Sequence, residues 1–118
     1  MLNINGVDLE FDMFDVETSK AYESAFEVLN KLVEGLKKET VMSTVFEESC
    51  AAIKTVFDTL FGGGTGIEVC GERDNYRTCN EALQALVDEA VKQRAELDEM
   101  QKAATTKYQG NRAQRRTK

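Results

Sequence analysis

Three segments of the chain repeat apolar residues along one helix face, and this repetition limits the possible folds more than any other feature. The stripes occupy residues 22–36, 42–60 and 79–97. Apolar residues at i, i+3, i+4 and i+7 predict an amphipathic helix that buries one side. The sequence contains no proline, which fits a helical protein with few sharp turns. We therefore predict a mainly α fold with three long helices.

Residues that favour helix ends flank these stripes. Asp15 or Thr18 can cap the start of the first helix, and Asp74 or Asn75 can cap the start of the third. Short oxygen-bearing side chains at this position accept hydrogen bonds from the free backbone N–H groups of the first turn. The third stripe fades toward Met100, and no periodicity remains past about residue 104.

The run GGGTG at residues 62–66 directly follows the second stripe. Glycine after an apolar stripe is typical of a helix C-terminus, so we predict a cap and a flexible linker here. A phosphate-binding loop would need GxxxxGK[ST], but Ile67 and Glu68 follow the last glycine. A hinge ordered by a partner is the remaining alternative. Residues 67–70 could form a brief strand.

The N-terminus has the pattern of a β-hairpin. Asn5-Gly6 suits a two-residue type I′ turn, which needs positive φ at both central positions. Val7, Leu9 and Phe11 alternate with acidic residues, so one face points to a core and the other to water. The acids lack the spacing of an EF-hand calcium loop. A lone hairpin is marginal in water, so we expect it to pack on the helices or pair with another chain.

The sequence carries no signature of an enzyme. It contains no histidine, which removes the ordinary Ser–His and Cys–His nucleophile pairs and a Cys/His zinc site. Cys50, Cys70 and Cys79 are one thiolate short of a Cys-only tetrahedral site, and we expect them to be reduced and buried. We predict no catalytic residue, no metal and no cofactor.

Charge divides the chain into an acidic domain, residues 1–104, and a basic tail, residues 105–118. The whole chain carries a net charge of −6. The tail contains five bases and no acid, so the residues before it sum to −11. Such a body repels a nucleic acid backbone, which makes nucleic acid an improbable partner. We predict that the tail is flexible when the protein is alone.

The tail has three interpretations. It could dock on an acidic protein surface, including that of a second copy, or it could be a plain solubilising terminus. As a nucleic-acid arm it ranks third, because Tyr108 is its one stacking residue. The candidate contact residues of the tail are Tyr108, Arg112, Arg115 and Arg116.

Aromatic residues of the second helix are candidates for a partner surface. Phe46, Phe57 and Phe61 would mark an oligomer or client surface if they remained exposed. Their ordinary role would be core packing. No apolar run approaches the roughly 20 residues that span a bilayer, and the acidic N-terminus is unlike a secretory signal. We therefore expect an intracellular protein without a membrane segment.

Three stretches of the chain resemble a known group of proteins: INGVDLEFDMFD at residues 4–15, FDTLFGGGT at residues 57–65 and YQGNRAQRR at residues 108–116. They are similar to small proteins encoded in the tail modules of phages and prophages of Gram-positive bacteria. In size and genomic neighbourhood these proteins resemble tail assembly chaperones. The resemblance covers nearly the whole chain in layout.

This resemblance implies a non-enzymatic, helical, self-associating protein of the bacterial host cytoplasm. Such proteins coat the hydrophobic tape measure protein during tail assembly and hand it to tail-tube subunits. The alternative is an acidic host-directed or anti-defence protein that mimics nucleic acid through its negative body. One dense acidic face would favour this alternative, and acids dispersed over all helices would weaken it.

Overall fold

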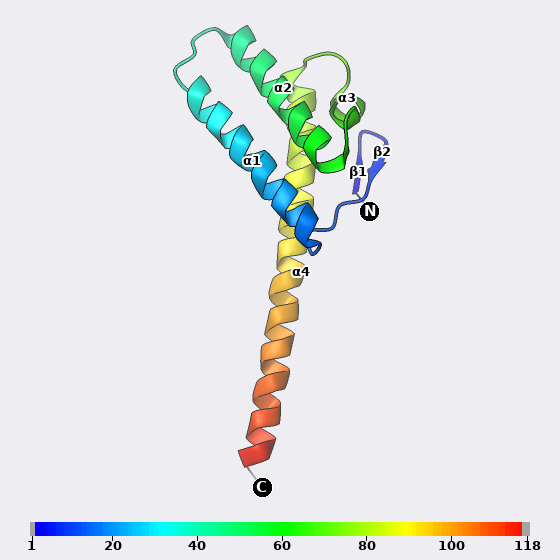
Figure 1. Ribbon diagram of the computed structural model, residues 1–118, viewed down its shortest axis with the longest axis vertical. Coiled ribbons are helices and arrows are strands. Elements are labelled where there is room, and N and C mark those ends of the chain that lie inside the picture. The colour runs from blue at the N-terminus through cyan, green and yellow to red at the C-terminus, as the bar shows by residue number, and fades with distance from the viewer. Residues whose placement is uncertain (1, 117–118) are drawn as a thin grey trace.

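The computed structural model describes the backbone of residues 2–116 and the side chains of residues 2–105. It confirms the mainly α fold class with an N-terminal hairpin and three long helices, and it adds one short helix (Figure 1). The elements in chain order are β1 (Leu2–Ile4), β2 (Val7–Leu9), α1 (Val16–Leu36), α2 (Met42–Phe61), α3 (Thr65–Cys70) and α4 (Tyr76–Arg116).

The hairpin forms as the Asn5-Gly6 pair predicts. Both turn residues have positive φ, 51° at Asn5 and 84° at Gly6. The strands are antiparallel, with Ile4 opposite Val7 next to the turn. The Asn5 side-chain amide donates a hydrogen bond to the Val69 carbonyl of α3. The hairpin is therefore held against the helices, as expected.

Capping residues fix the starts of two long helices. Asp15 accepts a hydrogen bond from the Glu17 N–H at 3.0 Å and so caps α1. Asn75 accepts from the N–H groups of Arg77 and Thr78 at 3.0 and 3.2 Å, which caps α4. Each satisfies N–H groups that have no partner within the helix.

The connection between α2 and α3 differs from two of the predictions. The GGGTG run ends α2 as expected, with the Gly62 N–H bonded to the Asp58 carbonyl. However, only residues 62–64 connect the two helices, because α3 begins at Thr65, and residues 67–70 are helical rather than a strand. The Gly66 N–H donates to the Asp58 carboxylate at 2.7 Å, and a Cβ at Gly66 would collide with the backbone of Lys54. This close approach to α2 leaves room only for glycine.

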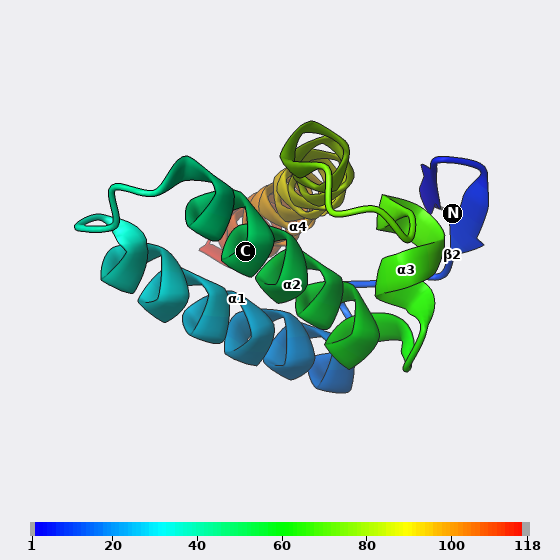
Figure 2. The same cartoon turned by 90° about the horizontal axis from the view of Figure 1, so that it is seen from above.

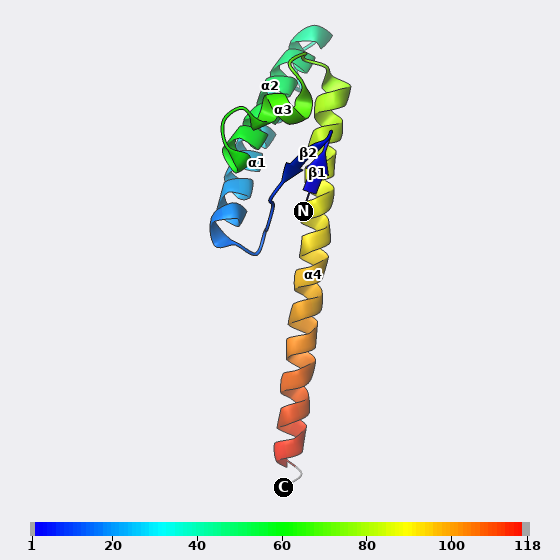
Figure 3. The same ribbon diagram turned by 90° about the vertical axis from the view of Figure 1, so that its right-hand side faces the viewer.

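Helix α2 lies between α1 and α4, as the view from above shows (Figure 2). The hairpin and α3 close one end of this layer and contact the first part of α4 (Figure 3). Phe57, Cys50 and Leu86 are fully buried where α2 meets α4. No helix within the described residues combines the length and apolar character needed to cross a bilayer.

Helix α4 continues beyond the predicted end near residue 104, because its backbone is helical to Arg116. The apolar pattern stops earlier because it marks burial rather than the helix end. Ala103, Ala104 and the Lys, Gln and Arg residues further along are good helix formers, but Thr105, Thr106 and Gly110 are not. The helix leaves the body and gives the molecule a length of 71 Å (Figure 1). The structure does not test the predicted flexibility of residues 105–118, whose side chains from residue 106 on lie outside the described ones, and it stays a prediction.

Candidate partner-binding surface

A groove of about 480 Å³ runs between α1 and α2. Small and aliphatic side chains form most of it. The α1 side contributes Ser24, Ala25, Val28, Leu29 and Leu32, and the α2 side contributes Glu48, Ala51, Ala52, Thr55, Val56 and Thr59. Val28 is 63% exposed, although it lies among apolar neighbours. Within the described part of the chain, nothing covers this aliphatic surface.

The groove exists because α2 is apolar or small on two opposite sides. At 100° per residue, Thr55 lies nearly opposite Phe57 around the helix axis. Phe57 is buried in the core, whereas Thr55 is exposed. The Thr55 hydroxyl donates to the Ala51 carbonyl at 2.9 Å, so its hydrogen bond is made within the helix. Its methyl group is thus left to line the groove.

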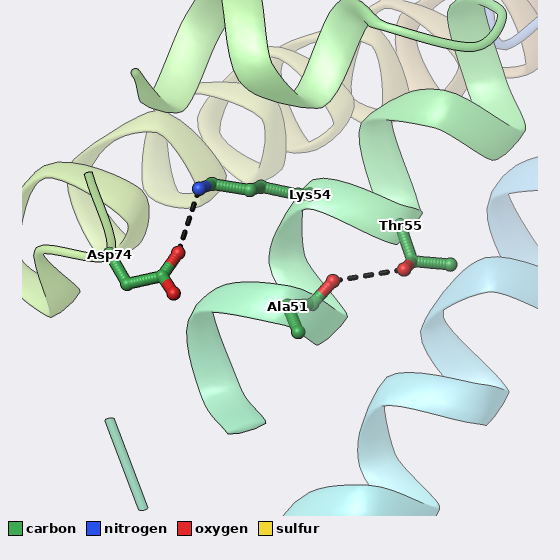
Figure 4. A network of polar contacts seen from close by, with 4 residues as sticks. All are labelled: Ala51, Lys54, Thr55 and Asp74. Carbon is green, nitrogen blue, oxygen red and sulfur yellow. Dashed lines mark hydrogen bonds and ion pairs between the residues drawn. The ribbon is translucent and has the colours of Figure 1, made fainter. Parts of the chain in front are cut away.

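A polar contact lies on a different side of α2. The Lys54 ammonium pairs with the Asp74 carboxylate at 2.8 Å, and the Lys54 side chain is only 14% exposed. Figure 4 shows Lys54 reaching toward Asp74, while Thr55 points the other way. The hydrogen bond to Asp74 raises the pKa of Lys54. This ion pair fixes the start of α4 against α2 and leaves the groove free of cations.

The charge around the groove is negative. Glu48 is the charged residue among those that line it, and it is exposed. Four acids and two bases on α1, with three acids and one base on α2, give these two helices a net charge of −4. The groove therefore suits a helix with an apolar stripe of its own and positive charge beside it.

The predicted aromatic residues do not line this groove. Phe46 is 37% exposed and stacks on Tyr76 with ring centroids 5.2 Å apart. Phe57 is fully buried, and Phe61 is half-buried between Phe57 and Phe11. Only Phe46 therefore meets the condition of exposure, and the structure does not bring the three together at a surface.

The remaining predicted contact residues belong to the end of α4. Tyr108, Arg112, Arg115 and Arg116 lie on the helical backbone of α4, and their side chains are outside the described ones. They are far along the chain from the groove residues. Their role as contact residues stays a prediction.

The groove residues were missed because they look like ordinary helix surface in the sequence. A signal was nevertheless present. Ala51, Thr55 and Thr59 recur at i, i+4 and i+8, which places three small residues in one row. Such a row beside the apolar stripe indicates a second helix face that another helix can approach closely.

The three cysteines form part of the core, as expected. Cys50, Cys70 and Cys79 are buried and free. Burial raises the pKa of Cys50 to about 12 and also raises the pKa of the other two thiols. These thiols are therefore protonated at neutral pH and are poor nucleophiles or metal ligands. Among the described residues, no cluster of acidic or sulfur ligands is arranged to hold a metal ion.

The fold and the groove define a small, mainly helical protein with an apolar surface between two antiparallel helices. The chain belongs to DUF6673, a family of unknown function, whose model matches residues 5–118. The matched residues include both groove helices and all of α4. No curated protein and no solved structure matches the chain.

Proposed function

We propose that the protein is a non-enzymatic tail assembly chaperone of a bacteriophage or prophage. Its clients are the tape measure protein, tail-tube subunits or both, and it acts in the bacterial host cytoplasm. The uncovered aliphatic groove between α1 and α2 is the observation that carries this proposal. The resemblance of residues 4–15, 57–65 and 108–116 to phage tail-module proteins supports it independently.

The groove supports recognition of an apolar helix. Val28 and Leu32 on one side and Ala51 on the other offer aliphatic contacts along two parallel walls. Small residues let a third helix approach closely, as in other helix-in-groove complexes. The resemblance implies a hydrophobic tape measure protein as client, and a long helical client would present such stripes repeatedly. Several copies of this protein could then cover it.

The distribution of acids weighs against the nucleic-acid mimic. Exposed acids occur on β2 and on all four helices, for example at Asp8, Glu17, Glu47, Glu68 and Glu81. Acids dispersed in this way do not form the one dense face that such a mimic needs. Client binding through the groove is therefore the better supported function.

Co-expression with the tape measure protein of the same locus tests this proposal. We expect the tape measure protein to become more soluble and to co-purify with the unaltered chain. Thr55→Arg places a charged side chain in the groove and should reduce co-purification at least about tenfold, equivalent to about 1.4 kcal/mol. Thr40→Arg adds the same charge at an exposed position outside the groove and should have no effect.

Two results would overturn the proposal. Failure of the unaltered chain to co-purify with either the tape measure protein or a tail-tube subunit removes the chaperone function. Equal co-purification with Thr55→Arg and Thr40→Arg leaves the function standing but removes the groove as the client surface. Both variants should keep the unfolding free energy within about 0.5 kcal/mol, because both sites are exposed.

A further inference from the structure

We propose that the groove between α1 and α2 binds the projecting end of α4, residues 98–116, from a second copy of this chain. The interaction would form in the absence of any client, so it does not rest on the proposed chaperone function. Four observations support it: the missing cover of this helix end, the position of the groove, the charges and the apolar residues of the two surfaces.

The first part of the projecting end of α4, residues 98–105, has no cover among the described residues. All residues from 98 to 105 are exposed, and Met100 is 58% exposed. An isolated helix of this length is marginal in water, because helix nucleation is costly and packing supplies most of the stability of helices in proteins. A partner that covers one side of this helix end would stabilise it.

The second copy must supply the helix, because α4 cannot reach the groove of its own chain. Cys50 of α2 contacts Cys79 of α4, so α4 packs on one side of α2. Thr55 and the groove lie on the other side of α2. From its contact with α2, α4 continues as one straight helix away from the body (Figures 1 and 3). Binding is therefore intermolecular.

The two surfaces have opposite charge. Residues 98–118 contain six bases and two acids, a net charge of +4. Helices α1 and α2 together carry −4, and Glu48 lies in the groove itself. Attraction between surfaces of opposite sign favours this pairing over pairing of two acidic grooves with each other. The interaction should weaken as salt screens the charges.

The apolar residues of the helix end also fit the groove. Met100, Ala103 and Ala104 are exposed at the start of the projecting segment. Methionine adapts its unbranched side chain to irregular apolar surfaces, and alanine lets two helices approach closely. The groove offers Ala51 and Val28 opposite them. We place Met100 in the groove and the basic residues beyond it along the acidic flanks.

The oligomeric state of the full-length protein tests this proposal, measured by sedimentation velocity at low and high salt without any client. We expect concentration-dependent association at low salt that weakens at high salt. Thr55→Arg should weaken association at least about tenfold. Thr40→Arg, which has the same net charge, should associate like the unaltered chain. A monomeric unaltered chain at low salt would overturn the proposal.

A mixing experiment identifies the two surfaces. One full-length variant carries Thr55→Arg and keeps its helix end intact; the other carries Arg112→Glu, Arg115→Glu and Arg116→Glu and keeps its groove intact. We expect each variant alone to associate weakly and the mixture to associate more strongly, because one intact groove meets one intact helix end. Full association of the triple variant alone would point to groove-to-groove pairing and overturn the proposal. A mixture no stronger than its components would also overturn it.

Discussion

The two halves of α4 share one backbone conformation but have different surroundings. In the first half, Cys79, Ala82 and Leu86 are buried against α2 and α3, with exposed fractions of 0, 2 and 0%. In the second half, residues 98–105 are all exposed. The first half is stabilised by packing, whereas the exposed residues 98–105 gain no such stability from the described part of the body. A continuous helix therefore need not have uniform stability.

This difference also separates two roles in the molecule. The packed half completes the core, so its side chains are constrained by their neighbours. In the projecting half, residues 98–105 are exposed, so their side chains are not constrained by packing against the described part of the body. The basic composition of residues 105–118 belongs to this second half. The acidic body and the basic end are thus joined by one continuous helical backbone.

The largest contrast is expected for truncation of one apolar side chain in each half. Leu86→Ala removes a fully buried side chain and should lower the unfolding free energy by about 2–5 kcal/mol. Met100→Ala shortens a side chain that is 58% exposed, so it should change the unfolding free energy by no more than about 0.5 kcal/mol. Urea denaturation under monomeric conditions measures both. Equal effects would show that the helix end packs on the body.

A smaller contrast is expected at Gln93, the last residue of α4 whose side chain hydrogen-bonds to the body among the described residues. Gln93 donates to the Phe11 carbonyl at 2.8 Å and accepts from the Met13 N–H at 2.6 Å. Gln93→Ala leaves both partly buried backbone groups without this partner, so it should lower the unfolding free energy by about 1–3 kcal/mol. The Gln84 side chain donates a hydrogen bond to exposed Asp88 on the same helix. Gln84→Ala should therefore lower the unfolding free energy by no more than about 0.5 kcal/mol.

Thermal or urea unfolding of the two glutamine variants decides whether Gln93 holds the β2–α1 loop. If Gln93→Ala lowers the unfolding free energy no more than Gln84→Ala does, water satisfies the backbone groups of Phe11 and Met13 as well as Gln93 does. At this level α4 would then be held to the body by the packing of Ala90 and Leu97 rather than by the hydrogen bonds of Gln93. A clear loss would place the boundary between the two halves after Gln93.

The sequence was sufficient for much of the fold, because burial patterns and caps are local features. The stripe of residues 22–36, the caps Asp15 and Asn75 and the Asn5-Gly6 turn all predicted what the structure contains. Helix α3 was missed because six residues are too few to establish a helical period. Its position depends instead on Gly66 lying against α2, which is a tertiary contact.

The candidate surface was harder to predict, because periodicity identifies a helix face but not what covers it. Phe46 and Phe57 are eleven residues apart and so share one face of α2. Phe57 is fully buried and stacks on Phe61, whereas Phe46 is near the start of α2, is 37% exposed and stacks on Tyr76. The groove of Ala51 and Thr55 results from the pairing of α1 with α2, which no single stripe specifies.

The smallest effect on stability is expected from weakening the projecting helix itself. Ala104→Gly lowers local helix propensity by about 1 kcal/mol, yet the global unfolding free energy should change by no more than about 0.5 kcal/mol, because exposed Ala104 is not coupled to the core. Helicity measured by circular dichroism should fall. Ala82→Gly is the matched control, and it should lower the global unfolding free energy by about 1 kcal/mol or more, because Ala82 is 2% exposed within the packed half. If Ala104→Gly destabilises the whole domain as much as Ala82→Gly does, the two halves of α4 unfold as one unit and the difference between them is one of exposure alone.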